Sequence, residues 1–340
     1  MKHLLLSISL CLLLGSAFAQ SRKDVRQYYY WINQAELAIC DNNYERASDC
    51  YHTAFTFKRA CIRDAHFAFQ LNSTYLYNLD RACEAFHFLA QAGTKAYFKD
   101  GTPYLEDTTS HPDLWQSLKT ISDTTLSLVN EDLYKALKEI ARDDQNARMT
   151  CSIAGAIIDH TDSLNYQKTR QLFQQYKDID EYTSGGAAMM TASFIHFAQL
   201  RLTTPDVFYE KMVKKGKLSA TNYMQNFDYC YHCVFTCDNK TTYGTDPSYT
   251  YVINNTFFIR YPDNVKQINK NRMKLNVAET WEDYVKKVMY VYHSDSPFRF
   301  YPLQMMFYGG QDIQEQMEKD ERARYDSGEL KGAYYIKEKK

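Results

Sequence analysis

The sequence has few of the residues that interrupt regular structure. Its 340 residues include 12 glycines and 7 prolines, beside 29 tyrosines and 19 phenylalanines. A β-sandwich needs many glycine- and proline-rich turns, so this composition favours a mainly α-helical fold with many aromatic contacts. The chain also has no P-loop, G-x-G-x-x-G, G-x-S-x-G or H-E-x-x-H motif. The common signatures of nucleotide binding and of hydrolytic catalysis are therefore missing.

An excess of charge of either sign is also absent. The chain contains 40 Lys and Arg against 41 Asp and Glu. This balance gives no electrostatic case for binding nucleic acid or an anionic membrane. No segment is apolar for long enough to cross a bilayer. We therefore predict neither a nucleic-acid partner nor a transmembrane segment.

The first residues have the three parts of an export signal. Lys2 supplies a positive charge, Leu4–Leu14 is a short apolar run, and residues 17–19 (A-F-A) form an A-x-A cleavage site. The sequence therefore predicts that residues 1–19 are a cleaved signal peptide. The mature protein is predicted to be periplasmic or extracellular.

Eight cysteines follow the signal peptide. They are Cys40, Cys50, Cys61, Cys83, Cys151, Cys230, Cys233 and Cys237. An even number in an exported protein permits disulfides but does not fix their pairing. The first four either join neighbouring helices or are small buried residues. The last three have the spacing of a metal knuckle, but the same thiols could form a disulfide or stay free. We predict no cofactor.

A short pattern occurs twice near the front of the chain. Residues 43–47 (NYERA) are echoed by residues 78–82 (NLDRA), and Tyr51 is echoed by Phe86, always 35 positions later. This spacing is close to that of a tetratricopeptide unit, a pair of helices of about 34 residues. Residues 20–94 resemble that family, whose helix pairs commonly offer a groove to a partner. Tyr51 and Phe86 are the predicted partner-binding residues. The alternative is a helical bundle whose two hairpins are alike.

The rest of the chain divides into a connection, a main domain and a tail. Glycine and proline punctuate residues 95–128, which we predict to be a connecting segment with one short helix near 113–121. A helical domain is predicted over 129–310 and a charged tail, either an exposed helix or frayed, over 311–340. Further predicted elements are a helix capped by residues 162–165, strands at 249–253 and 256–261 around an Asn-Asn turn, and helices at 265–274 and 280–292.

Within the main domain, residues 129–148 form an amphipathic pattern. Its apolar stripe consists of Leu133, Leu137, Ile140 and Ala141. Asp144 and Arg148 continue this stripe at helical spacing, with Gln145 beside them. Buried charges are costly unless they are paired. The cluster is therefore either an internal strut or the floor of a site.

Several short motifs follow one another in a fixed order. They are D-Q-x-x-R at 144–148, Asn165, His196, Asp228, Y-G-T at 243–245 and I-N-x-x-R at 268–272. In this order they resemble a family of uncharacterised exported bacterial proteins, over about residues 131–275. The family usually has arginine after the aspartate at 228, where Tyr229 stands here, and glutamine shortly before the Tyr-Gly pair, where Thr242 stands. The resemblance implies an architecture and no reaction.

Two functions are compatible with these patterns. The first, which the sequence favours, is an exported interaction protein whose helical hairpins bind a peptide or protein. The second is a hydrolase-like enzyme or an anion-binding protein. Its candidate catalytic residues are Asp144, His196 and Tyr243, and its candidate ligand-binding residues are Gln145, Arg148, Asn165, Asp228 and Arg272. Histidine is a usable acid or base near neutral pH, and arginine can bind an anion through two hydrogen bonds.

Overall fold

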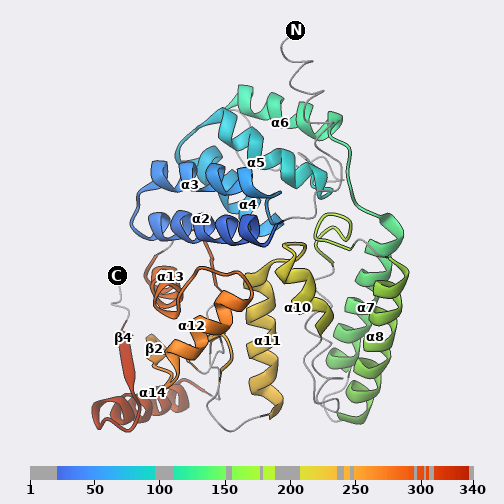
Figure 1. Cartoon of the computed structure of the whole chain (residues 1–340). Helices are drawn as coiled ribbons and strands as arrows, with labels where there is room; N and C mark the ends of the chain where they lie inside the picture. The colour runs from blue at the N-terminus through green and yellow to red at the C-terminus, as the bar shows by residue number, and fades with distance from the viewer. Residues whose placement is uncertain are drawn as a thin grey trace.

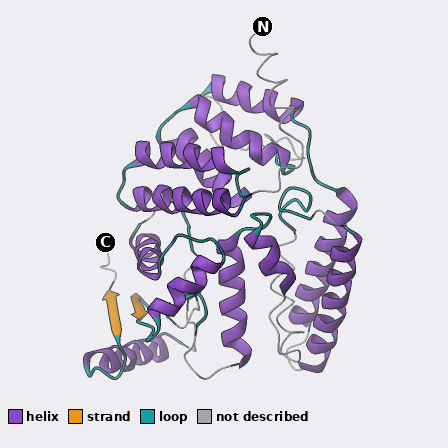
Figure 2. Ribbon diagram, viewed as in Figure 1, coloured by secondary structure: helices purple, strands orange, loops and turns teal. Residues whose placement is uncertain are grey.

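We describe the protein from a computed structural model. The structure describes residues 21–95, 111–150, 155–176, 179–187, 207–235, 241–245, 249–294, 297–301, 304–305 and 310–336. As the composition predicts, this part of the chain is mainly helical with one small β-sheet (Figure 2). None of its helices is both long and apolar enough to span a membrane.

Two helical hairpins form the N-terminal part. The first consists of α2 (Arg22–Cys40) and α3 (Tyr44–Phe57), and the second of α4 (Ile62–Gln70) and α5 (Leu79–Gln91). A π-helical turn, Leu71–Tyr75, extends α4. The side chain of Asn72 in this turn donates to the carbonyl of Ala68, which explains the local departure from α-helical bonding.

The residues that recur 35 positions apart have the same structural role in both hairpins. Asn43 caps α3 and Asn78 caps α5, each by accepting a hydrogen bond from a backbone N–H three residues later. Ala47 and Ala82 are both fully buried, which allows the two helices of each hairpin to approach closely. The predicted helical hairpins are therefore present, and their membership of the tetratricopeptide family stays a prediction.

The hairpins lie across one end of a larger helical body (Figure 1). α2 contacts α13, and one hydrophobic core extends continuously from Val25 in α2 to Tyr301 near the end of the body. The elements of this body are α7 (Glu131–Thr150), α8 (Gly155–Gln175), α10 (Val207–Lys214), α11 (Ala220–Phe235), α12 (Val265–Lys274), α13 (Trp281–His293) and α14 (Gln311–Asp326). α6 (Pro112–Thr124) packs instead on α5, on the side of the hairpins away from the body (Figure 1). The helices predicted near 113–121, 265–274 and 280–292 are confirmed by α6, α12 and α13.

α7 and α8 pack as a third hairpin at the side of the body (Figure 1). α7 confirms the helix predicted over 129–148. The predicted helix start at residues 162–165 is wrong, because α8 begins at Gly155. Asp162 and Asn165 are buried within α8, and the amide of Asn165 lies 3.4 Å from the carbonyl oxygen of Ile140, to which it donates. These polar residues face the neighbouring helix and do not cap their own.

The small sheet has four strands in the order β3-β1-β2-β4. They are β1 (Thr250–Ile253), β2 (Thr256–Arg260), β3 (Gln304–Met305) and β4 (Gly332–Ile336). β1 and β2 form the predicted hairpin, and Asn254 in its turn has φ = 52°. β3 is parallel to β1, and β4 is antiparallel to β2. Residues 311–336, predicted as a charged tail, form α14 and this outer strand.

Candidate functional site

A buried network of charged side chains joins the hairpins to the body. Its members are Glu36 on α2, Arg63 and Asp64 on α4, Arg272 on α12, Glu279 before α13, and Lys287 on α13. Three acids and three bases cancel, so the network carries no net formal charge. Burying a charge is costly without a partner, and here every charge has one.

Lys287 of α13 links the body directly to the N-terminal hairpins. Its Nζ lies 2.5 Å from Oε2 of Glu36 and 2.7 Å from Oε1 of Glu279. Nη1 of Arg272 lies 2.6 Å from the other oxygen of Glu279. Burial by itself raises the pKa of Glu279, but the Lys287 ammonium and the Arg272 guanidinium outweigh it and hold this pKa at about 2. Glu279 is therefore ionised throughout the ordinary pH range.

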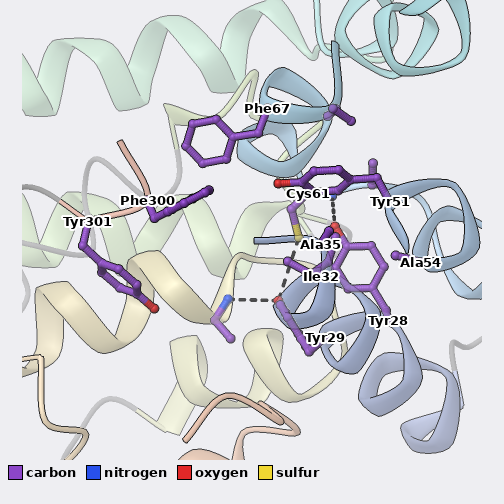
Figure 3. Packing of buried hydrophobic residues seen from close by; sticks show 14 of the residues in the cluster. Tyr28, Tyr29, Ile32, Ala35, Tyr51, Ala54, Cys61, Phe67, Phe300 and Tyr301 are labelled. Atoms are coloured by element: carbon purple, nitrogen blue, oxygen red, sulfur yellow. Dashed lines mark hydrogen bonds between the residues drawn. The ribbon is translucent and has the colours of Figure 1, made fainter. Parts of the chain in front are cut away.

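Arg63 connects this network to an aromatic cluster. Its Nη1 lies 2.7 Å from Glu36 and 2.9 Å from Asp64, and its Nη2 donates to the carbonyl oxygen of Phe300 at 3.0 Å. The Phe300 ring packs edge-to-face on Phe67 of α4, with centroids 5.4 Å apart. Figure 3 shows Phe300 beside Phe67 of α4, with Tyr301 farther from α4. A short non-helical segment, residues 297–301, therefore lies against α4.

A cavity of about 380 Å³ opens beside the same helix, where the hairpins meet the body. Its apolar wall consists of Ile62, Phe67 and Leu89, and its polar groups come from Arg63, His66, Thr94, Glu181 and Asn222. The residues from α4 recur at the spacing of one helical turn, so one face of α4 forms one wall. The opposite wall comes from residues 181–186 and the first turn of α11.

Glu181 fixes the two walls of this cavity relative to each other. One of its carboxylate oxygens accepts the backbone N–H of Ile62 at 2.9 Å, and the other accepts that of Ser219 at 2.7 Å. These donors belong to the N-terminal ends of α4 and α11, where unpaired N–H groups favour an anion. Burial nevertheless raises the pKa of Glu181 to about 7, against the opposing effect of these hydrogen bonds.

The predicted partner-binding residues lie in the core. Tyr51 is 1% exposed and Phe86 is fully buried. The inner face of the hairpins, where α2 and α4 lie, is covered by α13 and residues 297–301. Neither side chain is therefore available to an external partner, because Tyr51 lies beside Phe55 and Phe86 packs on Phe69 within the hairpins.

The candidate residues of the second hypothesis fall in two places. Asp144 and Asn165 are buried in the hairpin of α7 and α8, while Gln145 is exposed and donates to Asp144. Asp228, Tyr243 and Arg272 come together on the other side of α10, around α11 and α12 (Figure 1). The side chain of Arg148 and the whole of His196 lie outside the described residues.

Asp228 holds the loop that contains the Tyr-Gly-Thr motif. Its carboxylate accepts hydrogen bonds from the backbone N–H groups of Thr242, Tyr243 and Thr245 and from the hydroxyls of Thr241 and Thr245. Burial raises the pKa of Asp228, and these hydrogen bonds work in the opposite direction. A Cβ atom on Gly244, which has φ = 74°, would lie 2.4 Å from Trp281, so only glycine fits there.

Arg272 completes this corner of the body. Its Nε donates to the carbonyl oxygen of Tyr243 at 2.7 Å, and its Nη1 binds Glu279. The structure thus uses Asp228 and Arg272 to shape the chain and to anchor the charged network.

The cysteines whose side chains are described are free thiols. Cys40, Cys50, Cys61 and Cys83 form no disulfide, so of the two alternatives left open by the sequence, the one in which they join neighbouring helices is not found in the structure. Cys61 caps α4, and burial raises the pKa of its thiol to about 12. The side chains of Cys230 and Cys233, and the whole of Cys151 and Cys237, lie outside the described residues. Among the side chains that are described, no cluster of three metal-ligating residues occurs.

Comparison with known proteins adds no family. No protein-family model, no protein of curated function and no solved structure matches the chain. The resemblance given by the order of motifs therefore stays a prediction.

Proposed function

We propose that the protein is an exported interaction protein that binds an extended peptide segment of a partner in the cavity beside α4. The observation that carries this proposal is the position of the cavity. It lies between α4 and the segment 181–186 with the start of α11, and its volume of about 380 Å³ is within the range of natural ligand pockets. Export rests on the predicted signal peptide of residues 1–19.

The contacts of residues 297–301 support a peptide as the ligand. On the neighbouring part of α4, Arg63 donates to a backbone carbonyl of this non-helical segment, and Phe67 packs on its aromatic side chains. A partner segment could use the same combination of a backbone hydrogen bond and an apolar anchor. Thr94 and Asn222 supply a hydroxyl and an amide for the backbone, and Ile62 supplies apolar surface.

The charges around the cavity argue against an anionic ligand. The guanidinium group of Arg63, which lines the cavity, is already paired with Glu36 and Asp64. Glu181 adds a carboxyl group and no positive charge. Around α11 and α12, Asp228 and Arg272 already form hydrogen bonds to Thr245 and Glu279 of the same chain. We therefore favour the interaction protein over the hydrolase-like or anion-binding alternative.

The test is a peptide selection with variants that fill the cavity. Random peptides displayed on phage are selected on the full mature chain and then measured by fluorescence anisotropy. His66→Trp and Asn222→Trp place an indole in the cavity, and we expect each to weaken binding at least tenfold. His87→Trp is the matched control, because His87 is an exposed histidine on α5 outside the cavity lining.

Two results would contradict the proposal. One is a selection that yields no binding peptide. The other is a set of peptides that bind both cavity variants as tightly as they bind the wild type, when the melting temperatures of the two variants are near that of the wild-type protein.

A further inference from the structure

Among the residues that the structure describes, β4 is the outermost strand at one edge of the sheet. Its five residues, Gly332–Ile336, contain no charge and no proline, and the strand lies at the end of the strand order. Tyr335 is 37% exposed and Ile336 is 50% exposed. Natural proteins usually blunt such an edge with lysine, proline or a bulge, because an open strand edge pairs readily with another strand. The absence of these devices within β4 points to a strand partner.

The register shows which backbone groups of β4 point outward. Tyr261 donates its N–H to the carbonyl oxygen of Lys331, and Arg260 donates in the opposite direction, to Tyr249 beside β1. Alternate residues of an antiparallel strand direct their N–H and C=O groups to the same side. Lys331, Ala333 and Tyr335 therefore bond toward β2. Gly332, Tyr334 and Ile336 present their N–H and C=O groups to the outside.

We propose that a second copy of this chain pairs with β4 in antiparallel orientation about a two-fold axis at Tyr334. In this arrangement Tyr334 lies opposite its own counterpart, and Gly332 lies opposite Ile336 of the other copy. All three outward-facing residues then take part in hydrogen-bonded pairs, each of which exchanges two backbone hydrogen bonds. The two four-stranded sheets become one continuous sheet.

The side chains of β4 suit this self-pairing. On one face the smallest residue, Gly332, meets the exposed Ile336, and on the other face Ala333 meets Tyr335. Small residues opposite large ones avoid crowding between the two strands. The arrangement also closes at two copies, because the outer edge of β4 in each copy is fully paired with that of the other copy and a third copy has no β4 edge to bind. A strand of five residues offers a small contact area, so we expect a weak, concentration-dependent dimer.

The first experiment is sedimentation velocity of the full mature chain at increasing protein concentration. We expect a monomer at low concentration and a dimer at high micromolar concentration, with no larger species. Ile336→Lys places a charge on the edge and should abolish the dimer. Ile313→Lys is the matched control, because Ile313 is 54% exposed on α14 and lies outside the strand. We expect the control to dimerise like the wild type.

Amide hydrogen exchange by NMR distinguishes strand pairing from other contacts. The amides of Ala333 and Tyr335 should exchange slowly at every concentration, because they bond to β2. Those of Gly332, Tyr334 and Ile336 should exchange quickly in the monomer and slow at least tenfold in the dimer. A chain that stays monomeric, a dimer that persists in folded Ile336→Lys, or unchanged exchange of these three amides would overturn the proposal.

Discussion

Replacing Glu279 by glutamine should destabilise the whole molecule. Glu279 is 5% exposed and binds both Arg272 and Lys287 within 2.7 Å. Its pKa falls from 4.5 in the unfolded chain to about 2 in the folded protein. At about 1.4 kcal/mol per pKa unit, this shift corresponds to about 3 kcal/mol of folding free energy. Breaking a buried ion pair typically costs roughly 3–5 kcal/mol, which agrees with that value.

The same residue predicts how stability depends on pH. Because the folded pKa of Glu279 is lower than the unfolded one, its contribution is complete above about pH 4.5. It is lost as the pH falls from 4.5 to about 2. The wild type should therefore lose about 3 kcal/mol more stability than Glu279→Gln over this window, since glutamine does not titrate.

The assay is urea unfolding at pH 7 and at several values down to pH 2, followed by circular dichroism and tryptophan fluorescence. Glu329→Gln is the control, because Glu329 is exposed and pairs with Arg324 at the surface, where an ion pair contributes at most about 1 kcal/mol. The reasoning would be refuted if Glu279→Gln cost less than about 1 kcal/mol at pH 7. It would also be refuted if variant and wild type had the same pH dependence.

Three further outcomes are expected. Asp228→Asn should lower the free energy of unfolding by about 2–3 kcal/mol, measured by urea unfolding, because its new NH₂ group faces backbone N–H donors; no loss would contradict the role given to this carboxylate. Cys61 should react with iodoacetamide only after unfolding, as seen by peptide mass spectrometry, since burial keeps its thiol protonated; a disulfide-linked Cys61 peptide would contradict this. The purified exported protein should begin at Gln20 by intact mass, and retention of Met1 would remove the case for export.

Much of the fold could be predicted because local sequence determines it. Asn43 and Asn78 cap their helices through contacts three residues away, so the repeated letters predict the hairpins. The Asn-Asn turn between two apolar runs likewise predicts β1 and β2. The start of α8 was missed, because Asp162 and Asn165 have the side chains of capping residues. Their burial against α7 could not be read from neighbouring residues.

The site was harder to predict, because it depends on contacts between distant segments. Glu36 and Lys287 are 251 positions apart in the chain, and each has the sequence context of an ordinary exposed helical residue. The same holds for Glu181, which binds the first turns of α4 and α11. A lone acid in a turn carries no sequence signal for such a role. The apolar positions Tyr51 and Phe86 were recognisable, but the pattern could not show that both side chains are buried within the hairpins.

The measurement that tests the central claim most directly is a methyl NMR titration with a selected peptide. In a chain labelled at isoleucine methyl groups, the Ile62 signal reports on the cavity, and the Ile313 signal reports on an exposed site on α14. The account predicts that the Ile62 signal moves on saturation with the peptide and that the Ile313 signal does not. An unchanged Ile62 signal at saturation would contradict the claim that this cavity is the binding site.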